Sequence, residues 1–182
     1  MPRIHLFRVG HRGTQWPDTG NFSASREGVM EEVEVNVQDR ILRPVSEVFA
    51  AIIDPAKMSG YFISRATGPM KQGAEIEWNF DDVGARLSVE VKTIEENRLI
   101  MFDWSASGTK ARVTMRLEPR GNNATLVTIN EASWPMDAAG VERALEQTAG
   151  WTDFLCCLKA FVQHGINLRL GRGKEDHQTA GA

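Results

Sequence analysis

The sequence predicts an α+β domain in which a curved antiparallel sheet wraps around a long C-terminal helix, with two short helices after the first strand. Two observations predict this fold. Five segments between residues 75 and 131 alternate apolar with polar residues, which is the period of a half-buried strand. A stripe of apolar residues with helical spacing follows near the C-terminus: Trp151, Leu155, Leu158 and Val162.

The elements before the five segments follow from local signals. The alternation in EVEVNV predicts a first strand. Pro44 suits a first helical turn, and four apolar residues with helical spacing follow it: Val45, Val48, Phe49 and Ile52. Asp54 and Pro55 end this helix and can cap a second short helix over residues 55–60. Residues 61–67 can form a short strand.

Short connections rich in Gly, Asn and Asp separate the five segments, which favours hairpins and therefore antiparallel neighbours. One face of the predicted sheet is polar and the other apolar, so one side faces water and the other must be covered. The long covering helix can begin at Asp137 and end near Gly171 or Gly173. Gly150 would weaken a helix interior, so we expect a helix start or a close backbone approach there.

Composition limits the classes of function. The 182 residues are 42% hydrophobic and 25% charged, with a net charge of −3, which is ordinary for a globular domain and argues against nucleic-acid binding. No run of apolar residues is long enough to predict a membrane span. We expect a flexible N-terminal extension over 1–29, one domain over 30–170 and a disordered tail over 171–182.

Two passages carry a resemblance to a known superfamily. The stretch RPVSEVFAAIIDPAKMSGYF is similar to the helix pair that follows the first strand of START/Bet v 1-like (SRPBCC) proteins, which have the helix-grip fold. The stretch GWTDFLCCLKAFVQHG is similar to the signature that opens their last helix. Together they resemble the branch of the C-terminal domain of the Hsp90 ATPase activator Aha1, over residues 31–170. Tyr61 or Phe62 stands in the region where an aromatic residue, often Trp, is common in that branch.

The resemblance implies a groove or cavity between the sheet and the last helix. The alternatives are a pocket for an apolar ligand and a filled core, and the resemblance favours the pocket. The candidate lining residues are Phe62, Trp78, Phe80, Leu87, Val89, Phe102, Trp104, Met115, Ile129, Glu131, Trp151, Leu155 and Leu158.

Three functions remain open. The first is a single-domain binding protein for a hydrophobic small molecule or lipid-like metabolite, without a cofactor or metal. The second is a co-chaperone-like or stress-related module that acts through protein contact, with a chaperone as partner. The third is a cyclase- or dehydratase-like enzyme, which would need two inward polar groups close together, and the sequence offers one at most. We expect a monomer or homodimer.

Two acidic residues and two cysteines are the candidate reactive groups. Glu131 shares the parity of inward residues and could act as an acid or base, but a solvated position at the end of a strand is favoured. Asp103 has the opposite parity and is expected to be solvated. Cys156 and Cys157 are expected to be free, partly buried thiols of a cytosolic protein. Cys157 and His164 are too far apart along a helix to form a nucleophile pair.

Overall fold

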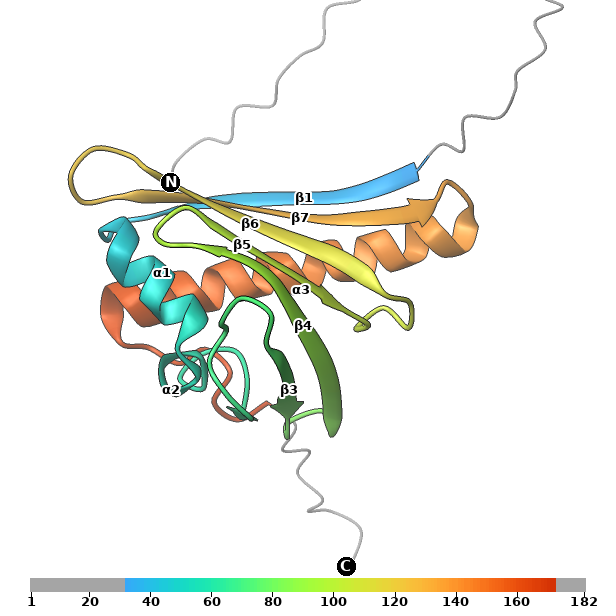
Figure 1. Ribbon diagram of the computed structural model, residues 1–182, viewed down its shortest axis with the longest axis horizontal. Helices are drawn as coiled ribbons and strands as arrows, with labels where there is room; N and C mark the ends of the chain where they lie inside the picture. Colours follow the sequence, from blue (N-terminus) through green and yellow to red (C-terminus); the bar gives the residue numbers. More distant parts are fainter. Residues whose placement is uncertain (1–31, 173–182) are drawn as a thin grey trace, which may run out of the picture.

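Seven strands form one antiparallel sheet in the computed structural model, which describes residues 32–172 (Figure 1). The predicted extension, residues 1–29, and most of the predicted tail lie outside the described residues. The order across the sheet is β1-β7-β6-β5-β4-β3-β2, so the first strand lies beside the last. The strands are β1 (Glu32–Ile41), β2 (Arg65–Ala66), β3 (Glu75–Phe80), β4 (Ala85–Glu95), β5 (Leu99–Trp104), β6 (Ala111–Pro119) and β7 (Thr125–Pro135).

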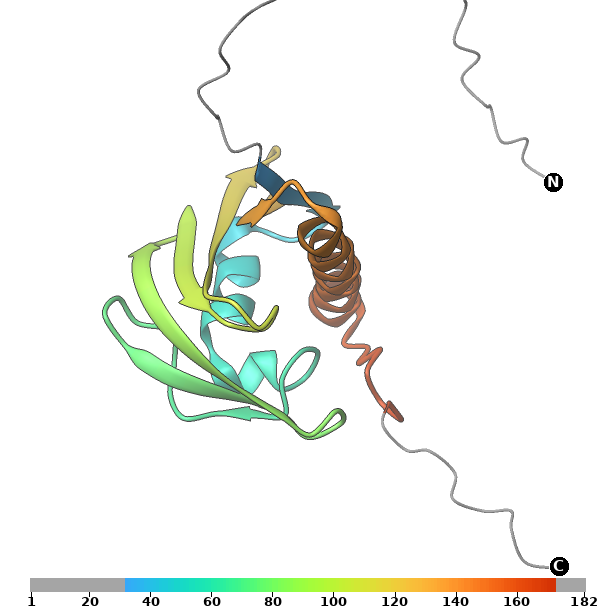
Figure 2. The ribbon, with the colours of Figure 1, turned by 90° about the vertical axis from the view of Figure 1, so that its right-hand side faces the viewer.

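The sheet curves around the helices, as the view along the long helix shows (Figure 2). Register irregularities lie in β1 between Val33 and Val35 and in β4 between Val91 and Thr93. Such irregularities increase the local twist and bend of a strand. The predicted helix-grip architecture is confirmed, with a curved antiparallel sheet and a long helix against its apolar face.

The two short helices form where their local signals predicted them. Helix α1 (Val45–Ile53) buries Val48, Phe49 and Ile52. In helix α2 (Pro55–Met58), the Asp54 carboxylate caps the first turn by accepting a hydrogen bond from the Ala56 backbone N–H at 2.9 Å. This cap satisfies a donor that the helix itself leaves unpaired.

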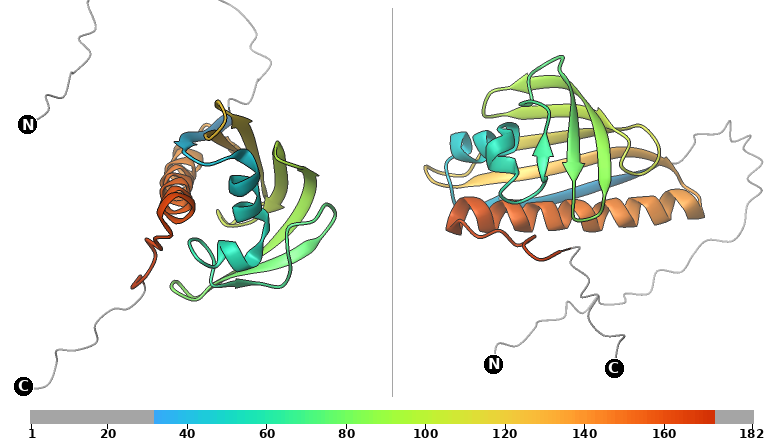
Figure 3. Two further views of the ribbon diagram at one scale, coloured as in Figure 1. Left: turned by 90° about the vertical axis from the view of Figure 1, so that its left-hand side faces the viewer. Right: turned by 90° about the horizontal axis from the view of Figure 1, so that it is seen from below.

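Helix α3 (Ala138–His164) lies along the open side of the sheet (Figure 3, right). The Asp137 carboxylate accepts a hydrogen bond from the Gly140 backbone N–H at 2.7 Å, which confirms the predicted N-cap. The expected end near Gly171 was wrong. The helix ends at Gly165, which takes a left-handed conformation with φ of 69°, a conformation that glycine adopts without steric cost.

Gly150 lies in the interior of α3, so the expected helix start there was wrong. The expected close approach was also wrong, since a Cβ atom at Gly150 would have no atom within 4 Å. The packing of the neighbouring Trp151 and Phe154, which are both buried, compensates for the weak helix propensity of this glycine.

The outer face of the sheet is polar, as predicted, but Asp103 is not solvated. Its side chain is 9% exposed because Arg112 covers it, with hydrogen bonds from Nε at 2.8 Å and Nη2 at 3.1 Å. Lys92 lies 3.7 Å away. These contacts lower the pKa of Asp103, and the hydrogen bonds from Arg112 make the largest contribution. The sequence pattern placed Asp103 on the correct face and missed its arginine partner, which lies opposite it on β6.

Candidate functional site

A pocket of about 110 Å³ lies between α3 and the sheet, and we call it the helix–sheet pocket. Trp104 from the end of β5 and Trp151 from α3 form its aromatic side, together with Phe62 from the loop after α2. The remaining lining residues are polar or lack a side chain: Gln147, Gly150, Asp153 and Arg169. An apolar surface with a few polar groups is typical of small-molecule sites.

Behind the aromatic side, the Glu131 carboxylate joins two indole rings. Trp104 Nε1 donates to one oxygen at 2.8 Å, and Trp151 Nε1 donates to the other at 2.6 Å. The two ring centroids are 5.0 Å apart. Because each indole N–H points toward Glu131, the rings present carbon atoms to the rest of their surroundings. The carboxylate therefore connects β5, β7 and α3 at the back of the pocket.

The expected solvated position for Glu131 was wrong, since the residue is fully buried. Strand β7 continues to Pro135, so Glu131 keeps the inward parity of Val127 and Ile129. Burial raises the pKa of Glu131, and the two indole hydrogen bonds oppose that rise. The indole N–H group donates hydrogen bonds and cannot accept them. Two tryptophans on the inward face therefore need a buried acceptor, and this requirement could have predicted the contact with Glu131.

The structure brings three of the predicted lining residues to the pocket: Phe62, Trp104 and Trp151. The others form the packed core, either buried or, for Leu87, half-buried: Trp78, Phe80, Leu87, Val89, Phe102, Met115, Ile129, Leu155 and Leu158. Glu131 lies behind the pocket without lining it. Sequence reasoning did not find Gln147, Asp153 and Arg169, because polar residues on an exposed helix face or after a helix carry no local signal of a site.

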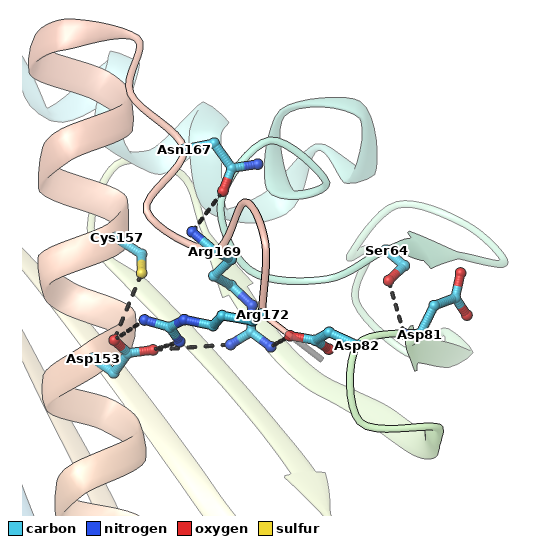
Figure 4. Close-up of polar contacts among 8 residues, drawn as sticks. All are labelled: Ser64, Asp81, Asp82, Asp153, Cys157, Asn167, Arg169 and Arg172. Atoms are coloured by element: carbon cyan, nitrogen blue, oxygen red, sulfur yellow. Dashed lines mark hydrogen bonds and ion pairs between the residues drawn. The ribbon is translucent and has the colours of Figure 1, made fainter. Parts of the chain in front are cut away.

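Two arginines and two aspartates form a cluster of ion pairs next to α3 (Figure 4), and two of the four, Asp153 and Arg169, line the pocket. The segment after α3, residues 165–172, which we call the C-terminal segment, carries both arginines. Arg172 donates two hydrogen bonds to Asp153 of α3, at 2.5 and 2.8 Å. They lower the pKa of Asp153. Arg169 forms an ion pair with Asp82, in the turn between β3 and β4, and its guanidinium carbon lies 6.0 Å from the centroid of the Phe80 ring.

A second pocket, of about 140 Å³, shares part of its wall with the first. Phe62 and Arg169 line both pockets. The second pocket also contains Ser59, Tyr61, Ile63, Ser64, Asp82 and Asn167. A third pocket, lined by Arg40, Arg120, Gly121 and Leu126, lies apart from both, near the turn between β6 and β7.

With this geometry established, comparison with known proteins identifies the family. The family model described as "Activator of Hsp90 ATPase homolog 1-like protein" matches residues 43–163. The chain belongs to this family. No curated protein matched the sequence.

Solved structures share the fold of this Hsp90-activator-homologue domain. Protein SSP2350 from Staphylococcus saprophyticus is 29% identical, with a TM-score of 0.66, over 75% of this chain and 96% of that chain. DynU16, a putative protein in the dynemicin biosynthetic locus, is 27% identical, with a TM-score of 0.65, over 72% of this chain and 48% of that one. The Aha1 dimer from Colwellia psychrerythraea is 17% identical, with a TM-score of 0.64, over 74% and 99%.

Other reactive groups of this family member contribute little to the candidate site. Among residues 32–172, no cluster of His, Cys, Asp and Glu could hold a metal ion. Cys156 and Cys157 are free, as predicted, with Cys156 exposed and Cys157 buried. Burial raises the pKa of Cys157, which leaves it a thiol rather than a nucleophilic thiolate. Within the described part of the chain, no helix is both long and apolar enough to span a membrane.

Proposed function

We propose that this domain binds an apolar small molecule in the helix–sheet pocket. The observation that carries the proposal is Gly150, which lines the pocket from the interior of a 27-residue helix. Alanine there would stabilise the helix by about 1 kcal/mol. Neither a left-handed conformation nor a close contact requires glycine, since φ at Gly150 is not positive and its Cβ position is open. A glycine at this position keeps the space beside Trp104 and Trp151 free of a side chain.

The size and chemistry of the site support a small, largely apolar ligand. A space of about 110 Å³ is somewhat smaller than the enclosed apolar cavity of about 150 Å³ that binds benzene, and unlike that cavity it is partly open and has polar residues in its lining. The Phe62, Trp104 and Trp151 rings offer an aromatic surface, and their packing against the core holds it in place. Glu131 could serve as an acid or base only if a ligand displaced an indole, because both of its oxygens accept hydrogen bonds from tryptophan.

Substitution of Gly150 tests the proposal. Toluene binding is measured by ligand-observed NMR, with native mass spectrometry of the freshly purified protein as a search for a retained natural ligand. Gly150→Leu fills the space beside the tryptophans, and we expect it to abolish toluene binding while the protein stays folded. Gly150→Ala is the graded comparison, because its single methyl group takes part of the space; it should raise the thermal midpoint and weaken toluene binding without abolishing it. Equal toluene binding by the parent and the leucine variant would rule out this site.

The alternative is a protein-contact module of the kind that the family's name describes. The row of exposed apolar residues in the C-terminal segment favours it: Ile166, Leu168 and Leu170 are 51%, 47% and 79% exposed. Exposed apolar surface of this kind is typical of interaction sites. Stimulation of an Hsp90 ATPase by the purified domain, lost when Leu168 and Leu170 are both replaced by Ser, would support this alternative.

A further inference from the structure

Arg169 lines two adjacent pockets, the helix–sheet pocket and the second pocket, and Phe62 is the one other residue that lines both. The pockets have volumes of about 110 and 140 Å³. Joined, they would approach the lower end, about 300 Å³, of the usual range for ligand sites. Arg169, whose side chain is 18% exposed, and Phe62 are the two residues that the pockets share, so movement of the Arg169 side chain would open one pocket toward the other.

Arg169 has donor capacity left on the side of the helix–sheet pocket. Its Nη2 donates to Asp82, whereas its Nη1 lies 3.8 Å from Asp153, beyond hydrogen-bond distance. Asp153 instead accepts two hydrogen bonds from Arg172. Within residues 32–172, Nη1 of Arg169 donates no hydrogen bond, and it is not sealed in the protein interior. A guanidinium with a free N–H edge beside an apolar surface suits the acidic group of a ligand.

The segment that carries Arg169 is attached mainly by charge. Gly165 and Gly171, with φ of 69° and 88°, lie at its two ends. Its apolar side chains, Ile166, Leu168 and Leu170, face outward, so little apolar burial holds it. Asn167 and Arg169 face inward and line the second pocket. The pair of Arg172 with Asp153 is partly exposed, and pairs of this kind contribute little to stability, so an anion that competes for Arg169 can loosen the segment.

We propose that the ligand is an amphipathic organic acid and that its acidic group binds Arg169. This inference rests on the proposed function and adds the chemical class of the ligand. The apolar body lies on Phe62, Trp104 and Trp151, and the acidic group accepts hydrogen bonds from the guanidinium of Arg169. The acidic group binds first at Nη1, which is free, and when it also draws Nη2 away from Asp82 the Arg169 side chain moves and the two pockets join.

Two fluorescent probes with the same aromatic body test the proposal. Anilinonaphthalenesulfonate carries a sulfonate, and phenylnaphthylamine is its neutral counterpart. At low ionic strength we expect the parent protein to bind the sulfonate at least about tenfold more tightly, the effect of one charge-assisted hydrogen bond. Arg169→Gln should bind both probes equally well. Asp82→Asn, which releases Arg169 from its partner, should bind the sulfonate more tightly than the parent does.

Matched variants separate this site from other arginines. Arg65→Gln removes a similar pair, Arg65 with Asp81 at 3.0 Å, that lies outside all three pockets, and it should leave both affinities unchanged. Arg120→Gln tests the third pocket. Equal binding of the two probes by the parent, or loss of the sulfonate preference in Arg120→Gln rather than Arg169→Gln, would overturn the proposal. Toluene binding that depends on Gly150 would still stand in that case, so failure of this inference differs from failure of the proposed function.

Discussion

The buried Glu131 gives the sharpest test of how this fold holds its helix against its sheet. In Glu131→Gln, one oxygen can still accept from one indole, but the amide group meets the other indole N–H as a second donor. A buried N–H without an acceptor costs about 1–3 kcal/mol. At a pH where the parent carboxyl is neutral, the hydroxyl oxygen of the acid can still accept from the second indole and the amide nitrogen cannot, so we expect the free energy of unfolding to fall by about that amount.

The difference between parent and variant should shrink as the pH rises. Burial raises the pKa of Glu131 in the folded protein above the ordinary value of 4.5, so the folded state binds the proton more tightly than the unfolded chain does. The parent's advantage is fully present below that ordinary value and is lost as the pH rises through the raised pKa. The maximum slope is about 1.4 kcal/mol per pH unit for one group. The glutamine variant lacks this proton and this slope.

Urea denaturation followed by tryptophan fluorescence measures both effects, from about pH 4.5 to pH 8. Asp103 and Asp153, whose pKa values are lowered, titrate in the opposite sense in both proteins and cancel in the difference. Glu118→Gln, at an exposed carboxylate on β6, is the control and should match the parent throughout. A difference that is independent of pH, or that grows as the pH rises, would refute the reasoning about Glu131.

Three further outcomes are expected. A variant that lacks residues 1–29 should keep the circular dichroism spectrum and thermal midpoint of the full chain, because the apolar residues of that stretch follow neither a helix nor a strand period; a large loss of stability would contradict this. Replacing Cys156 with Ser and Cys157 with Ala should leave toluene binding intact, and a mapped disulfide or a bound zinc ion would show that the thiols are not free. Gly140→Ala should destabilise the protein by about 1–3 kcal/mol in urea, because its Cβ would lie 1.9 Å from the Pro135 carbonyl oxygen; an unchanged midpoint would show that the turn can shift.

The fold was predictable because its signals are local. Alternation of the kind seen in Ile76, Trp78 and Phe80 fixes which face of a strand is buried, whatever lies next to it. The caps at Asp54 and Asp137 need only the two or three residues that follow them. The types and order of the elements and the polar and apolar faces could therefore be read from the chain alone, whereas the end of α3 at Gly165 could not.

The candidate site was predictable only in part because its contacts are distant in sequence. Arg169 pairs with Asp82, 87 residues earlier, and nothing near either residue indicates the other. The alternation in β7 indicated that Glu131 shares the inward face. The two indoles that donate hydrogen bonds to it, and so lower the free-energy cost of burying it, come from other elements. At Gly150 the local signal was misleading. The low helix propensity of glycine predicted a helix start there, but tertiary packing outweighs this propensity and the helix continues through it.

The pairing of β1 with β7 has a consequence for biosynthesis. Val37 pairs with Ile129, so the first strand leaves the ribosome roughly ninety residues before its partner. At usual rates of translation that interval is roughly 5–20 s. Throughout it, the backbone N–H and C=O groups of the nascent β1 have no neighbouring strand, and the apolar side chains that face α3 have no helix to cover them. Newly made chains are therefore open to chaperone binding or aggregation until the last third of the polypeptide has emerged.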